Sequence, residues 1–101
     1  MAFRLNYLPY ADKQLRDLES NPATKKKADR IKRAIGFLEQ NPRHRSLQTH
    51  EFKSETGPKG EKMWQAYAET NTPRAWRVLF YYPEGEQGTI TVYAIVPHPD
   101  D

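Results

Sequence analysis

The chain has 101 residues, enough for one domain with a modest core, and its formal net charge of +3 makes it mildly basic. It contains no cysteine, which excludes disulfides, thiolate metal sites and a cysteine nucleophile. No secretory leader pattern and no apolar stretch of membrane-spanning length are present, so we expect a single cytoplasmic domain over residues 1–101 and no membrane segment.

The first forty residues carry one strand pattern and two helix patterns. Residues 3–8 alternate apolar and polar side chains at first and end before a proline, which is typical of a short strand. Residues 10–19 place apolar side chains at helical spacing, and so do residues 28–38. Asn21 and Pro22 fit the N-cap and the first position of the second helix, so we expect two helices in an antiparallel hairpin.

The rest of the chain is strand-like after a charged loop. Residues 41–62 are rich in charge, proline and glycine, and we expect an edge strand there only over 47–52. Strand-like runs follow over 63–68, 75–82 and 89–96. The predicted order is β-α-α-β-β-β, an α+β fold in which a helix hairpin packs on one face of an antiparallel sheet. The opposite face is left for solvent or a ligand.

Charge is distributed unevenly, because every lysine and arginine lies at or before Arg77. Arg77 itself lies inside an apolar, aromatic run, where a cation needs a partner or an open cleft. Strand alternation places Arg77 and Tyr81 on the same face, and we expect that face to be the one without helices. A guanidinium there suits a phosphate, which it binds bidentately, whereas an ion pair with Glu69 is the purely structural alternative.

Other cations lie on the second helix and in the loops. The helix carries a run of basic residues over 25–33, which fits a solvated face, phosphate or an acidic protein partner. The candidate RNA-binding residues are loop cations, histidines and one strand tyrosine: Arg43, His44, Arg45, His50, Lys53, Lys59, Arg74 and Tyr81. Turn capping and ordinary surface charge are the alternative for the 43–53 loop. The histidine spacing matches no standard zinc pattern, so we expect no metal and no other cofactor.

The order of elements and three short segments resemble the RelE/ParE superfamily of toxins from type II toxin–antitoxin systems. Residues 38–43, 76–81 and 90–98 look like the family patterns L-x-x-N-P, Y-R-V-x-Y and I-x-x-x-x-I-x-x-H. The likeness spans nearly the whole chain. Several members cleave mRNA on the ribosome, while others poison gyrase without being nucleases, so function has to be argued from the site.

The resemblance implies roles for three residues. Arg77 matches the family's phosphate-contacting arginine, His98 lies where nuclease members place a basic residue after the last strand, and Lys62 lies near their catalytic lysines. The implied activity is a metal-independent endoribonuclease, in which the 2′-OH attacks the adjacent phosphorus and leaves a 2′,3′-cyclic phosphate and a 5′-OH. Arg77 and lysine stabilise the phosphate charge and His98 transfers a proton, with His44 or His50 as alternatives.

The resemblance also implies the partners, which are a cognate antitoxin protein, mRNA and the ribosome. Two alternatives stay open: a ParE-like protein that binds gyrase and cuts nothing, and a non-catalytic member that only binds an antitoxin.

Overall fold

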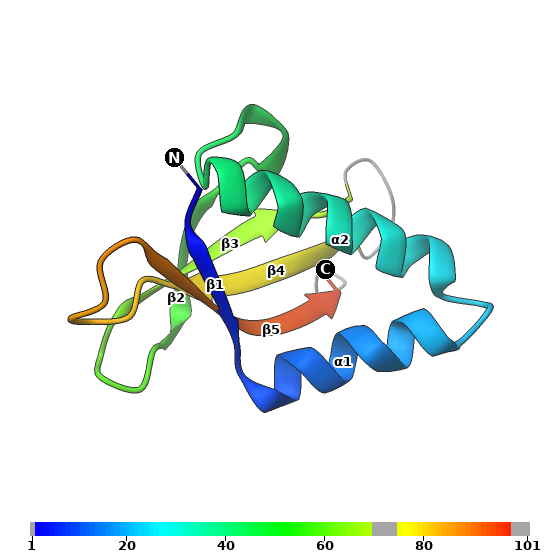
Figure 1. The fold of residues 1–101 in the computed structure, drawn as a ribbon, viewed down its shortest axis with the longest axis horizontal. Coiled ribbons are helices and arrows are strands. Elements are labelled where there is room, and N and C mark those ends of the chain that lie inside the picture. Colours follow the sequence, from blue (N-terminus) through cyan, green and yellow to red (C-terminus); the bar gives the residue numbers. More distant parts are fainter. Residues whose placement is uncertain (1, 70–74, 98–101) are drawn as a thin grey trace.

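Five strands form one mixed sheet, and two helices lie together across one of its faces (Figure 1). The strands are β1 (Arg4–Tyr7), β2 (His50–Thr56), β3 (Lys62–Tyr67), β4 (Trp76–Tyr81) and β5 (Thr89–Pro97), arranged in the order β1-β5-β4-β3-β2. The helices are α1 (Pro9–Ser20) and α2 (Lys25–Gln40), followed by a short 3-10 helix, η1 (Arg45–Leu47). This computed structural model describes residues 2–69 and 75–97. Within that part of the chain, neither helix is long and apolar enough to cross a membrane.

The predicted α+β fold with a helix hairpin on one sheet face is confirmed, but the sheet is not wholly antiparallel. β1 pairs in parallel with β5, from Arg4↔Thr89 to Tyr7↔Val92. The other three strand pairs are antiparallel. No hairpin joins β1 to β5, because the chain passes through both helices and three strands between them, so nothing forces the antiparallel direction on this pair.

Two predicted boundaries were also wrong. α2 begins at Lys25 rather than Pro22, because Asn21 stabilises a turn: its side-chain oxygen accepts a hydrogen bond from the Ala23 N–H at 2.9 Å. The edge strand predicted over 47–52 begins only at His50, because residue 48 adopts a left-handed conformation after η1.

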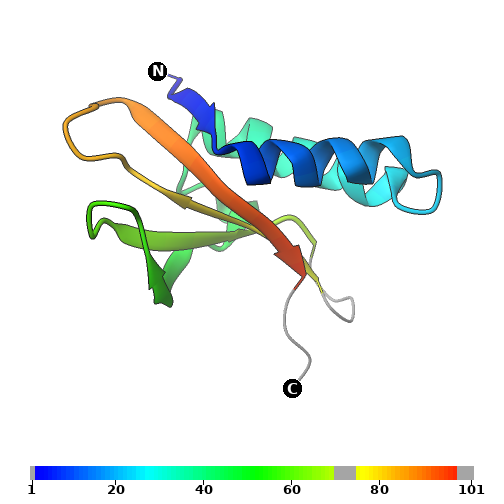
Figure 2. The same cartoon turned by 90° about the horizontal axis from the view of Figure 1, so that it is seen from below.

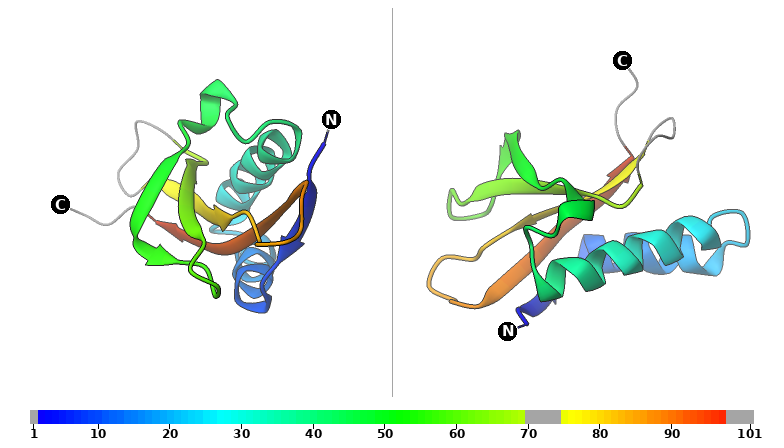
Figure 3. Two further views of the ribbon diagram at one scale, coloured as in Figure 1. Left: turned by 90° about the vertical axis from the view of Figure 1, so that its left-hand side faces the viewer. Right: turned by 90° about the horizontal axis from the view of Figure 1, so that it is seen from above.

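The main core lies between the helix hairpin and the sheet. α2 contributes a stripe of buried residues at the predicted helical spacing: Ala28, Ile31, Ala34, Ile35 and Leu38. Val78 and Phe80 of β4 belong to the same cluster and have no exposed surface. Figures 2 and 3 show both helices on one side of the sheet, so this core is one-sided.

The sheet face away from the helices has a smaller core of its own. Met63, Leu79, Tyr81 and Ala94 are buried there, and Phe52 of β2 packs against them. Alternation along β3 and β4 separates this set from the helix-side residues. The sheet is strongly twisted, and β2 turns away from the plane of β4 and β5 (Figure 3). The face predicted to be open is therefore partly covered.

A glutamine side chain of α1 completes the hydrogen bonding of β5. In the described part of the chain, β1 pairs with residues 89–92 and does not reach the backbone of Ile95. Gln14 occupies this place: its Nε2 donates to the Ile95 carbonyl oxygen at 2.7 Å, and its Oε1 accepts from the Ile95 N–H at 2.9 Å. One side chain thus both satisfies a buried strand edge and docks α1 on the sheet.

Replacing Gln14 by alanine should lower the free energy of unfolding by about 1–3 kcal/mol, because two partly buried backbone groups lose their partners. Urea denaturation measures the change. Gln40→Ala, at an exposed position that ends α2, is the matched control and should stay within about 0.5 kcal/mol of the wild type. Equal effects of the two substitutions would show that the amide bridge contributes nothing.

Candidate functional site

Arg77 lies near the start of β4 on the face away from the helices, as predicted, but its predicted exposure is wrong. Only 5% of the residue is exposed. Its Nη1 donates to Gln65 Oε1 at 2.5 Å, and its guanidinium carbon lies 5.2 Å from the centroid of the Phe52 ring. Burial lowers the pKa of Arg77, and the interaction with Tyr67 opposes that shift. The covering residues come from β2 and β3, whose register the sequence alone did not reveal.

The guanidinium has a buried donor that is not used. Arg77 Nε is buried and has no hydrogen-bond partner among the residues that the structure describes. Leaving such a donor unsatisfied costs about 1–3 kcal/mol. A buried polar group without a partner therefore calls for an explanation, and a ligand oxygen is one.

Three polar side chains accompany Arg77 on this face. Tyr67 pairs directly with Arg77 across β3 and β4, and His50 pairs with Gln65 across β2 and β3. The His50 and Tyr67 rings lie 5.5 Å apart. We call Arg77, Gln65, Tyr67 and His50 the Arg77 cluster. Gln65 was missed by the sequence analysis, although it interrupts the apolar and aromatic run 63–68.

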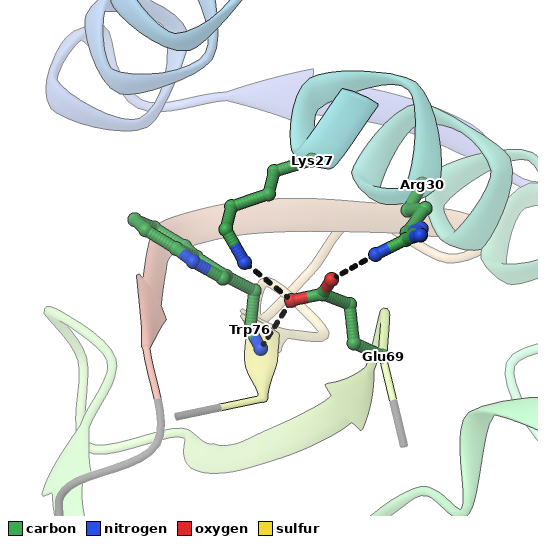
Figure 4. Close-up of polar contacts among 4 residues, drawn as sticks. All are labelled: Lys27, Arg30, Glu69 and Trp76. Atoms are coloured by element: carbon green, nitrogen blue, oxygen red, sulfur yellow. Dashed lines mark hydrogen bonds and ion pairs between the residues drawn. The ribbon is translucent and has the colours of Figure 1, made fainter. Parts of the chain in front are cut away.

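Glu69, the alternative structural partner of Arg77, binds two cations of α2 instead (Figure 4). Its carboxylate accepts from Arg30 Nη1 at 2.6 Å and from Lys27 Nζ at 3.4 Å, and also from the Trp76 backbone N–H at 3.3 Å. Only 2% of the Glu69 side chain is exposed. Burial raises its pKa, but the hydrogen bonds with Arg30, Trp76 and Lys27 outweigh burial and leave the pKa below its ordinary value.

The structure does not bring Lys62 to Arg77. Lys62 pairs with Thr56 at the start of β3, whereas Arg77 pairs with Tyr67 at its end. Alternation also places Lys62 on the face of Trp64, opposite the face of the Arg77 cluster. His98 and Arg74 lie outside the described residues.

The remaining candidates fall in different environments. Tyr81 is 4% exposed and belongs to the small core, so it is less accessible than predicted. Lys53 is exposed on β2, and Lys59 is exposed in the turn before β3. His44 caps η1, since its Nδ1 accepts from the Ser46 N–H at 3.1 Å.

Five predicted residues gather around two aromatic side chains that the sequence analysis did not select. Arg43, His44 and Arg45 line a cleft of about 450 Å³ together with Trp64 and Tyr82. We call this the aromatic cleft. An adjoining cleft of about 450 Å³ shares Trp64 and Tyr82 and adds two further cations, Lys59 and Lys62. The predicted binding residues thus divide into the Arg77 cluster and this cationic, aromatic surface.

Metal-binding residues do not gather in either place. Within the described residues, no three histidine, aspartate or glutamate side chains lie close enough together to hold a metal ion.

Comparison with known proteins shows a similarity in structure. No family model matches the chain, and no curated protein matches it in sequence. The solved structure of the YoeB dimer from Staphylococcus aureus is similar, with a TM-score of 0.69 and 12% sequence identity, over 98% of this chain and 100% of that one. The match confirms the fold that the order of elements indicated, a helix hairpin on one face of a sheet.

Glu69→Gln should lower the free energy of unfolding at pH 7 by about 1–3 kcal/mol, because it removes charge-assisted hydrogen bonds from a buried group. The lowered pKa means that the carboxylate stabilises the fold fully above its ordinary pKa of 4.5 and loses this effect as the pH falls below that value. The stabilities of wild type and variant should therefore converge on acidification.

Urea denaturation at pH 7 and at pH 3 tests this expectation. Asp17→Asn is the control, because the ion pair of Asp17 with Lys13 is exposed and should contribute less than about 0.5 kcal/mol. A deficit of the Glu69→Gln protein that is the same at both pH values would contradict the argument.

Proposed function

We propose that this protein is the toxin of a type II toxin–antitoxin pair and that it cleaves mRNA on the ribosome without a metal ion. The RelE-like fold, matched over 98% of the chain, supports the toxin role. The observation that carries the nuclease proposal is the state of Arg77, whose Nη1 is held by Gln65 while its buried Nε has no described partner.

The chemistry requires a fixed positive charge beside the reacting phosphate. Attack by the 2′-OH forms the O2′–P bond and breaks the P–O5′ bond, and negative charge grows on the non-bridging oxygens. A guanidinium whose orientation is already fixed by Gln65 stabilises this charge without reorganising. A base takes the proton of the 2′-OH, and an acid gives one to the 5′-oxygen. The products are a 2′,3′-cyclic phosphate and a 5′-OH.

Histidine suits both proton transfers near neutral pH. We assign this role to His98, and His50 is the alternative because it pairs with Gln65 on the same face as Arg77. His44 is less suited, since it lines the aromatic cleft and does not belong to the Arg77 cluster. The catalytic role of Lys62 stays a prediction, and its position favours contact with RNA away from the reacting phosphate.

The proposed partners follow from this role. A cognate antitoxin would neutralise the protein, the substrate is mRNA on the ribosome, and the cytoplasm is the corresponding location. The basic surface of α2 offers an attachment point for polyanions, although Lys27 and Arg30 are partly committed to Glu69.

A non-catalytic role in antitoxin binding is the second candidate, and the burial of Arg77 favours it. With 5% of the residue exposed, a phosphate reaches Nε only if Phe52 or Gln65 moves aside. The two candidates differ in whether the isolated protein stops translation.

Expression without an antitoxin should arrest growth by stopping translation. Pulse labelling should show incorporation of amino acids falling before incorporation of thymidine, because mRNA is the proposed substrate. If DNA synthesis falls first, gyrase is the target and the nuclease proposal is wrong. If neither falls, the protein acts only by binding.

Arg77→Ala should reduce mRNA cleavage on ribosomes about 10²-fold or more, the usual cost of removing a transition-state donor. Because Arg77 is buried, the substitution should also lower the melting temperature, in contrast to the small effect expected for an exposed residue. Leu79→Ala is the matched control, since Leu79 is buried on the same strand and the same face. Leu79→Ala should destabilise the fold and keep its activity at temperatures where it is folded. An equal loss of activity in both variants would make the effect of Arg77 structural.

A further inference from the structure

The aromatic cleft contains two large rings that the proposed chemistry does not use. Trp64 alternates with Gln65 along β3, so it lies on the helix side of the sheet and not beside the Arg77 cluster. Tyr82 directly follows β4 and is 39% exposed. Both rings line a cleft that is also lined by cationic side chains.

The tyrosine ring is held in place by other aromatic residues. Phe80 meets it edge-on, with ring centroids 5.9 Å apart, and Phe3 of the N-terminal segment lies 6.2 Å away. Burial raises the pKa of Tyr82, and the nearby charge of Arg43 opposes this shift. A braced ring loses little conformational freedom when a flat ligand stacks on it.

The loop that supplies the two arginines is also fixed. The Arg43 N–H donates to Asn41 Oδ1 at 3.0 Å, and Thr49 Oγ1 donates to the Pro42 carbonyl oxygen at 2.6 Å. His44 stacks on Phe37 of α2 with ring centroids 4.2 Å apart. Arg43 and Arg45 therefore start from a backbone that is already ordered.

The charge of this surface is mainly positive. Arg43 and Arg45 line the aromatic cleft, and Lys59 and Lys62 line the adjoining one. Glu61 also lines the adjoining cleft, but its carboxylate accepts hydrogen bonds from the backbone N–H groups of Lys59 at 2.7 Å and of residue 84 at 3.2 Å. Glu84 is the other carboxylate there. The two clefts thus hold four cations and two carboxylates, of which one is already hydrogen-bonded to the backbone and the other is exposed.

We propose that the aromatic cleft binds single-stranded RNA, with bases stacked on Trp64 and Tyr82 and phosphates paired with Arg43 and Arg45. Aromatic platforms beside basic side chains are how proteins hold unpaired bases, whereas duplex RNA keeps its bases stacked and offers mainly its backbone. The site lies on the face of the sheet opposite the Arg77 cluster, so it holds RNA and does not cut it. The proposal stands whether or not the protein is a nuclease.

Fluorescence anisotropy with a labelled 12-nucleotide 2′-O-methyl RNA tests the proposal, because this probe cannot be cleaved by 2′-OH attack. Tyr82→Ala should weaken binding about 5- to 100-fold, as expected for the loss of one stacked base, and leave the salt dependence unchanged. The double variant Arg43→Gln/Arg45→Gln should weaken binding and reduce the slope of log K against log salt by about 1.4, for two lost phosphate contacts.

The double variant Lys25→Gln/Lys26→Gln is the matched control, since it removes the same charge from an exposed part of α2. It should bind nearly as well as the wild type. The proposal is overturned if this control loses as much affinity as the arginine double variant, if Tyr82→Ala binds within twofold of the wild type, or if a duplex of the same sequence binds as tightly as the single strand.

A second measurement keeps the test decisive if Tyr82→Ala does not fold. The chain contains two tryptophans, so Trp76→Phe leaves Trp64 as the only reporter. Saturating RNA should quench the Trp64 fluorescence, because a stacked base lies against the indole. Unchanged fluorescence at saturation would rule out stacking on Trp64. Neither measurement depends on cleavage, so a failed nuclease test at Arg77 and a failed binding test here are distinguishable.

Discussion

The parallel pairing of β1 with β5 determines which surface of the sheet is covered. β1 lies at one edge of the sheet and β2 at the other, so the chain between them has to cross its full width. The helix hairpin makes that crossing on a single face, where α2 buries its whole apolar stripe. Among the described residues, no helix covers the opposite face, where Arg77 lies under Phe52 of β2.

Local periodicity explains what the sequence predicted well. The helical spacing of α2 and the alternation of β3, β4 and β5 are properties of neighbouring residues, and the structure follows them closely. The errors concern long-range pairing. Strand alternation alone predicted an exposed Arg77. It could not reveal that Phe52 covers this residue, because the position of Phe52 depends on a β2–β3 register that shifts between Glu51 and Thr56. The structural alternative, an ion pair of Glu69 with Arg77, does not form because Lys27 and Arg30 of α2 bind Glu69, and strand alternation does not reveal where α2 approaches.

Strand alternation also explains why the predicted site residues separate into two groups. Trp64 and Gln65 are neighbours in sequence, yet one lies with the helix-side core and the other holds Arg77. The candidate site residues chosen from the sequence therefore belong to two surfaces on opposite faces of the sheet. Their division suits a protein that holds an extended polymer on one face and acts on it at the other, a separation that one small sheet provides without a second domain.

The bond between Gln14 and Ile95 joins residues that are 81 positions apart in the chain. β1 and α1 are made early by the ribosome, but the strand on which both depend is β5, the last element in chain order. During synthesis the helix hairpin therefore emerges without its partner, and the main core cannot close until β5 has been released from the exit tunnel. Such an order of assembly delays the functional surface until β5 has been translated.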